Sequence, residues 1–100
     1  MLKEIYEGPL AIQNAQRGRL LGEEGSVKLG GLEDITERMR AIDRLFVVSC
    51  GTSYYAGLVG ECMLEEYAGI PVEVVHASEF RYRKIPYGTN AAALFISQSG

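Results

Sequence analysis

Apolar residues in the second half of the chain form three short runs, with one long amphipathic stretch between the first two. The first run, "LFVVS" within residues 45–50, is continuous rather than alternating, which is typical of a strand buried on both faces of a parallel sheet. The runs within residues 72–76 and 91–97 predict two further strands. Apolar positions at helical spacing predict a helix from about residue 53 to residue 68, which Gly69 ends.

The order of these elements predicts an α/β fold. A strand, a helix, a strand, a short helical or irregular piece around residues 77–83 and a third strand together favour a parallel sheet with right-handed crossovers. If the third strand returns on the far side of the first, the strand order is 2-1-3. The ends of strands one and three are then neighbours at a topological switch point, where open α/β sheets bind ligands.

The pattern before residue 45 is mainly helical. The first residues predict a short helical turn, a break at Gly8-Pro9 and a second helix that ends before Gly18. Residues 22–31 combine glycines with charges, as a loop or linker does, and their middle is ambiguous between loop and strand. Residues 32–42 carry apolar positions at helical spacing and predict an amphipathic helix.

Hydroxyl-bearing residues follow both apolar strands at the predicted switch point. Thr52 and Ser53 come after the first strand, and Ser97, Gln98 and Ser99 come after the third. The backbone N–H groups and the positive end of the helix dipole at Ser53 favour a bound phosphate, even without a nearby Lys or Arg.

Gly51 allows close approach of a ligand to the backbone. The same "CGTS" segment also fits an ordinary helix N-cap, in which Thr or Ser serves no ligand. The second hydroxyl-rich loop favours the phosphate hypothesis.

Other reactive side chains are interpreted as structural. His76 is the only histidine, and Cys50 at the helix start has no histidine nearby in sequence that would activate it. The tyrosines are expected in the core or at an interface. The cluster of Arg81, Arg83 and Lys84 is expected on a solvated or subunit-contacting face.

Composition narrows the class of protein. The 100 residues are 47% hydrophobic and carry a net charge of −3, which favours one globular domain and argues against nucleic acid as a partner. The two cysteines lack a metal-ligand pattern, so reduced thiols in the cytoplasm, and no metal or cofactor, are expected. No apolar stretch approaches the ~20 residues that span a bilayer.

Three motifs carry a family resemblance over nearly the whole chain. "CGTSYYAGL", "AGIPVEVVHASEFRYR" and "LFISQSG" resemble the first half of the sugar-isomerase (SIS) module in the glutamine–fructose-6-phosphate aminotransferases (isomerising). "MLKEIYEGPLAI" and "RGRL" resemble the start of the isomerase region of that family. The resemblance implies a Rossmann-like three-layer α/β sandwich, with residues 1–31 as a helical segment and loop and residues 32–100 as half of a SIS module.

The resemblance also implies roles for single residues. Ser53, Ser97, Gln98 and Ser99 would surround the phosphate of fructose 6-phosphate or glucosamine 6-phosphate, and Thr52 would reach the sugar. The family transfers ammonia from glutamine and isomerises the sugar in amino-sugar biosynthesis, as a homodimer in the full enzyme.

The resemblance implies further that no catalytic residue lies within this chain. The glutaminase cysteine would precede residue 1, and the isomerisation glutamate, lysine and histidine would follow Gly100; His76 does not match that histidine. We therefore expect a truncated, catalytically incomplete substrate-binding part with underprotected apolar surface at Leu94 or Phe95. A non-catalytic regulatory SIS-like module is the alternative, and a flavodoxin-like FMN protein is a distant third.

Overall fold

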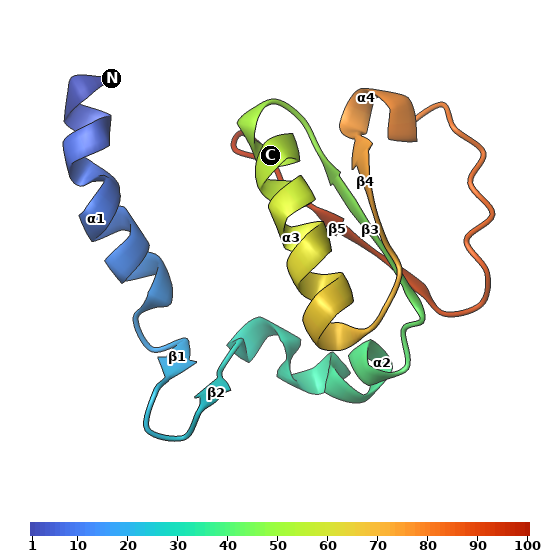
Figure 1. The fold of residues 1–100 in the computed structure, drawn as a ribbon, viewed down its shortest axis with the longest axis horizontal. Helices are drawn as coiled ribbons and strands as arrows, with labels where there is room; N and C mark the ends of the chain where they lie inside the picture. Colours follow the sequence, from blue (N-terminus) through green and yellow to red (C-terminus); the bar gives the residue numbers. More distant parts are fainter. The chain divides into compact units, whose positions relative to one another are not determined.

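The computed structural model describes residues 1–100, which divide into two compact units, Met1–Thr36 and Glu37–Gly100. The second unit contains a three-stranded parallel sheet with the order β4-β3-β5. Its strands are β3 (Arg44–Ser49), β4 (Val72–His76) and β5 (Ala91–Phe95) (Figure 1). The first predicted strand is therefore central, and the predicted order 2-1-3 is confirmed.

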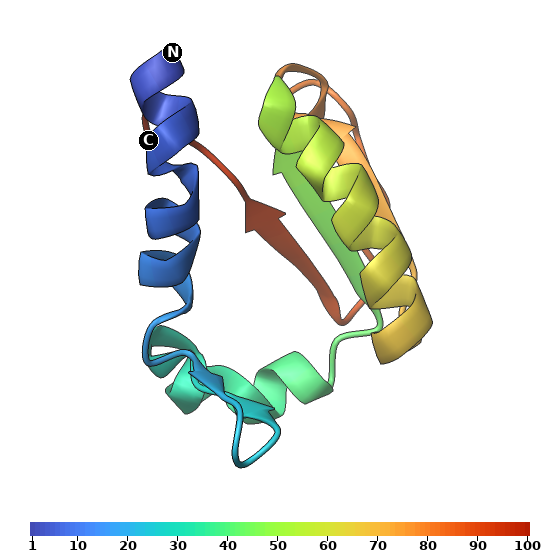
Figure 2. The ribbon, with the colours of Figure 1, turned by 60° about the vertical axis from the view of Figure 1, so that its left-hand side comes forward.

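Helix α3 (Thr52–Ala68) covers one face of this sheet over β3 and β4 (Figures 1 and 2). The helix lies close to the sheet because Gly57 is buried in the contact. A Cβ atom at Gly57 would lie 3.0 Å from Val74 Cγ1 and 3.2 Å from Val47 Cγ1. The helix ends at Gly69, whose φ of 66° is left-handed, as the sequence predicts.

The opposite face of the sheet holds the hydrophobic core. Phe46, Val48, Val75 and Ile85 form its buried cluster. Phe80, at the end of the short helix α4 (Ala77–Phe80), packs against this cluster. The piece around residues 77–83 is thus a single helical turn followed by irregular chain.

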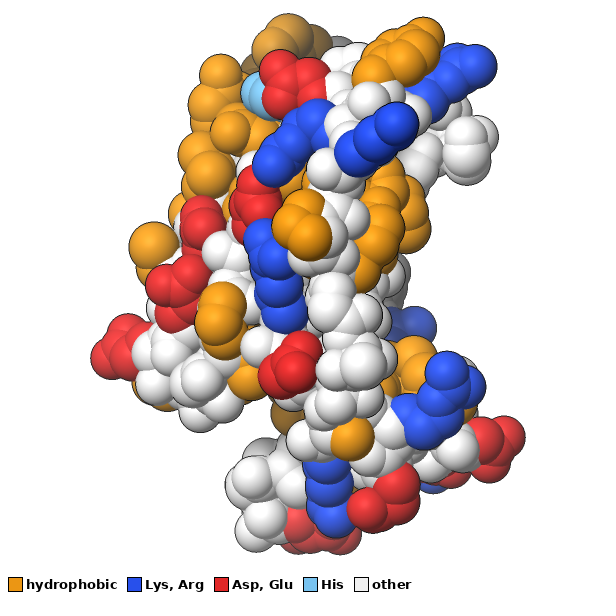
Figure 3. All heavy atoms as spheres, turned by 90° about the vertical axis from the view of Figure 1, so that its right-hand side faces the viewer, with side chains coloured by type: hydrophobic (Ala, Val, Ile, Leu, Met, Phe, Trp, Pro, Cys, Tyr) orange, Lys and Arg blue, Asp and Glu red, His pale blue; other side chains and the backbone are white.

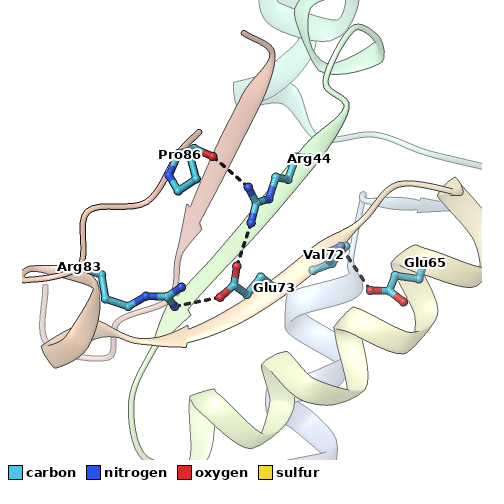
Figure 4. A network of polar contacts seen from close by, with 6 residues as sticks. All are labelled: Arg44, Glu65, Val72, Glu73, Arg83 and Pro86. Atoms are coloured by element: carbon cyan, nitrogen blue, oxygen red, sulfur yellow. Dashed lines mark hydrogen bonds and ion pairs between the residues drawn. The ribbon is translucent and has the colours of Figure 1, made fainter. Parts of the chain in front are cut away.

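Glu73 joins this irregular chain to the sheet through paired charges (Figure 4). Its carboxylate accepts a hydrogen bond from Arg83 at 2.9 Å and one from Arg44 at 3.0 Å. Arg44 also donates to the carbonyl of Pro86 at 3.0 Å. The hydrogen bond from Arg83, with the positive charges of both arginines, lowers the pKa of Glu73 although burial opposes the shift. The polar side chains of this network therefore have hydrogen-bond partners within the chain.

The first unit differs from the sequence prediction at its helix. Helix α1 (Leu2–Gln16) runs unbroken through Pro9, so the predicted break at Gly8-Pro9 is wrong. A proline inside a helix removes one backbone hydrogen bond, and its ring crowds the carbonyl four residues earlier. The helix continues through Pro9 in spite of this local cost, because the residues around it are mostly good helix formers.

A small antiparallel hairpin follows α1. Strand β1 (Leu20–Leu21) pairs with β2 (Ser26–Val27), and Gly25 at φ 61° lies in the turn between them. The ambiguous middle of residues 22–31 is therefore partly a strand. Strands of two residues are too short to show the alternation by which a sequence reveals them.

The predicted amphipathic helix over residues 32–42 forms only in part. A 3₁₀ helix η1 (Gly30–Ile35) precedes a short α2 (Thr36–Arg40). The hydroxyl of Thr36 donates to the carbonyl of Glu33 at 2.9 Å, and it also lies 3.3 Å from that of Leu32. The Thr36 hydroxyl competes for these backbone carbonyls, which weakens the regular α-helix at this point of the segment.

Candidate functional site

The candidate site lies where β3 and β5 end side by side. The parallel register pairs Val48 with Phe95, and the Ile96 N–H then donates to the Val48 carbonyl at 3.0 Å. Residues 97–99 therefore leave the sheet beside the segment that leads from Ser49 into α3. The expectation that the ends of the first and third strands are neighbours is confirmed.

The turn between β3 and α3 is built around Gly51. Gly51 is the N-cap residue of α3, with φ 59° and ψ −136°, a conformation that side chains with a Cβ rarely adopt. A Cβ atom there would meet nothing within 4 Å, so the backbone angle and not crowding requires glycine. The position that a Cβ atom would occupy at Gly51 is therefore open space.

No side chain caps α3. An ordinary Ser or Thr cap is therefore the wrong interpretation of "CGTS", since the Tyr54 N–H donates instead to the Gly51 carbonyl at 3.1 Å. The N–H groups of Thr52 and Ser53 lie in the first turn, where a helix offers them no internal acceptor. Thr52 is exposed and Ser53 is half-buried. The helix start thus presents donors and hydroxyls that the helix itself does not use.

The loop after β5 is similarly open. Ser97, Gln98 and Ser99 are all exposed, and the Ser97 hydroxyl oxygen accepts a hydrogen bond from the Gly100 N–H at 3.0 Å. The hydroxyl hydrogen of Ser97 is left available to an acceptor. The two loops therefore contribute hydroxyl and amide groups at adjacent strand ends.

The electrostatic character of this edge comes from the helix. The first turn of the 17-residue α3 contains no acidic residue, so no carboxylate competes for the positive end of its dipole. In the basic cluster of Arg81, Arg83 and Lys84, Arg83 pairs with Glu73 and the Arg81 guanidinium lies 5.5 Å from the Tyr82 ring centre. Charges of both signs are interspersed over the face in Figure 3. An anion at the two loops beyond β3 and β5 would be held by amides and hydroxyls.

Two features near the site are not visible in the sequence pattern. The Ser49 side chain is 1% exposed, and its hydroxyl has no hydrogen-bond partner. His76 stacks on Tyr54 with ring centres 3.8 Å apart and an angle of 11° between the rings. Both features depend on which face of its strand a residue occupies. A continuous apolar run has no alternation from which that face could be inferred.

The cysteines and the acidic residues do not form a further site. Cys50 and Cys62 are exposed free thiols, and no group of three His, Cys, Asp or Glu residues could hold a metal ion. None of the helices has the length and apolar character needed to cross a membrane. The chemistry of the site thus rests on the two hydroxyl-bearing loops.

Comparison with known proteins finds the SIS domain model over residues 38–100. A glutamine–fructose-6-phosphate aminotransferase (isomerising) from Chlorobaculum tepidum is 49% identical over the whole chain, and enzymes of the same name from Thermus thermophilus and Clostridium acetobutylicum are 49% and 44% identical. The chain spans 16% of the length of these relatives.

A solved structure is also similar to this chain. It is the C-terminal domain of glucosamine-fructose-6-phosphate aminotransferase from Francisella tularensis, with a TM-score of 0.81 and 37% identity. The match covers 98% of this chain and 26% of that one.

Proposed function

Since the chain belongs to the SIS domain family, we propose that it binds the phosphate group of a sugar phosphate at the two loops beyond β3 and β5. Ser53, Ser97, Gln98 and Ser99 hold the phosphate, and Thr52 reaches the sugar. The observation that carries the proposal is the uncapped start of α3 beside a second hydroxyl-bearing loop. Unpaired amides at a helix N-terminus are a common way to bind phosphate.

The proposed ligands are the substrate fructose 6-phosphate and the product glucosamine 6-phosphate. Fructose 6-phosphate comes from the names of the relatives, which state an aminotransferase reaction on it, and glucosamine 6-phosphate comes from the family resemblance. The relatives match residues 1–37 as well as the SIS segment, which supports membership in this enzyme rather than in a free-standing regulatory module. The whole enzyme is proposed to be a cytoplasmic homodimer active in amino-sugar biosynthesis.

We assign these residues to substrate binding and not to the isomerisation reaction. Isomerisation moves a proton between sugar carbons and needs a general base within hydrogen-bond reach. The two loops offer hydroxyl, amide and backbone groups, and His76 is engaged in the stack with Tyr54. These 100 residues are therefore expected to form no glucosamine 6-phosphate from fructose 6-phosphate, with either glutamine or ammonia as nitrogen donor.

An NMR titration tests the proposed binding. The chain is expected to respond to fructose 6-phosphate at lower concentration than to fructose. Ser53→Ala should weaken that response by about tenfold or more, because a hydrogen bond to a charged group contributes roughly 1.5–3 kcal/mol. Ser26→Ala, at an exposed serine in the other unit, is the matched control and should bind as the unmodified chain does. An equal response to fructose and fructose 6-phosphate would contradict the proposal.

A further inference from the structure

His76 lies at the same end of the sheet as the proposed phosphate loops. It is the last residue of β4 and pairs in register with Ser49, the last residue of β3. Tyr54 lies in the first turn of α3, directly after Ser53. Their rings are stacked nearly parallel, at 11°, with centres 3.8 Å apart. One edge strand and the start of the helix are therefore joined by a ring-on-ring contact.

This contact matters because no side-chain hydrogen bond caps the start of α3, and the close packing on the sheet lies further along the helix, at Gly57. The helix has no side-chain cap, and its N-cap residue, Gly51, carries no side chain that could anchor it. The Tyr54 N–H closes the turn on the Gly51 carbonyl at 3.1 Å. A wrongly placed first turn would move the Thr52 and Ser53 donors together, since all of them belong to the same short segment.

We propose that His76 is a positioning residue, whose ring holds Tyr54 and so keeps the first turn of α3 in the geometry that binds phosphate. The inference rests on the proposed function, because it assigns His76 a role in that same site. Stacked aromatic pairs stabilise one arrangement beyond the burial of their surface. Both rings are half-buried, so the contact is partly shielded from water. His76 itself does not touch the substrate in this account.

The role requires a flat ring and not the imidazole nitrogens. His76→Phe keeps a face that can stack on Tyr54, and His76→Ala removes it. By NMR titration of the 100-residue chain with fructose 6-phosphate, His76→Ala should raise the Kd by about 2- to 12-fold, the range that an aromatic pair supports. His76→Phe should bind within about twofold of the unmodified chain, a factor smaller than a typical aromatic pair contributes. If His76→Ala fails to fold, His76→Leu, which is bulky but not aromatic, takes its place.

Amide exchange of Tyr54 gives a second readout without ligand. In His76→Ala, exchange at the Tyr54 amide should accelerate, while the Gly69 amide, bonded to Glu65 at the other end of α3, keeps its rate. A general loss of stability would accelerate both amides. Equal acceleration at both ends would therefore overturn the positioning role, as would a His76→Phe variant that loses as much affinity as His76→Ala.

The binding data separate the two possible failures. If the unmodified chain binds fructose 6-phosphate in preference to fructose and His76→Ala binds it equally well, only the positioning role is wrong. If the unmodified chain shows no preference, the proposed function is wrong and the positioning role is overturned with it. In that case a local change in Tyr54 exchange would mean that the stack is purely structural.

Discussion

Two polar regions of the sheet unit differ in whether their polar groups are hydrogen-bonded within the chain. Around Glu73, the side chains of Arg44 and Arg83 are paired with a carboxylate, and the Pro86 carbonyl is paired with Arg44. At the loops beyond β3 and β5, no side chain caps α3, and the hydroxyl-bearing residues are exposed or half-buried. The first region uses its polar groups to hold the fold. The second leaves them available to a ligand.

The comparison also separates the two regions by charge. The Glu73 network contains full charges that neutralise one another in part, and its carboxylate pKa is lowered by the hydrogen bond from Arg83. The loop region contains no charged side chain between Gly51 and Ser53 or between Ser97 and Ser99. A phosphate would therefore meet neutral donors and the helix dipole, without a carboxylate among them.

Gly51→Ala is the change with the largest expected effect on the loop region. Alanine at φ 59° is strained, so the free energy of unfolding should fall by about 1–3 kcal/mol, as measured by urea denaturation. Affinity for fructose 6-phosphate should fall as well. Gly60→Ala is the matched control, because Gly60 lies within α3 without a positive φ and a Cβ there meets nothing within 4 Å. Alanine at that position should be neutral or stabilising by up to about 1 kcal/mol. If both variants lose the same unfolding free energy, the positive φ of Gly51 is not the cause of the loss.

Glu73→Gln is expected to have a smaller effect, and on stability alone. Half-exposed ion pairs contribute at most about 1 kcal/mol each, so urea denaturation should show a loss of roughly that size at neutral pH. Binding of fructose 6-phosphate should not change, since this network is not assigned to the site. Reduced affinity with unchanged stability would reverse the roles of the two regions.

The pH dependence of this loss should be the smallest effect. Because the pKa of Glu73 is lowered in the folded chain, its ion pairs add stability above the ordinary pKa of glutamate. That contribution is lost as the pH falls through the lowered value, where the carboxylate becomes protonated. The difference in unfolding free energy between the unmodified chain and Glu73→Gln should therefore shrink from pH 7 toward pH 3. A difference that grows toward acid would contradict the assigned shift.

The difference between the regions also explains what the sequence could predict. The strands follow from continuous apolar runs and one long helix, and their order follows if the third strand returns on the far side of the first. The hydroxyl residues follow the strands directly in the chain. Glu73 instead meets Arg44 across 29 positions, and His76 meets Tyr54 only because β4 lies beside β3 in one register. Such contacts depend on tertiary placement, which local patterns do not encode. The predictions near Pro9 and over residues 30–42 are wrong because opposing local preferences compete there; at Pro9 a helix-breaking residue lies among good helix formers.

Ser53→Ala and Glu73→Gln, compared by fructose 6-phosphate titration in NMR and by urea denaturation, most directly test whether the two regions have separate roles. Ser53→Ala should lose affinity by about tenfold or more and keep its unfolding free energy within about 0.5 kcal/mol. Glu73→Gln should show the reverse pattern. If both variants lose stability and affinity together, the division between a paired structural region and an open binding region is contradicted.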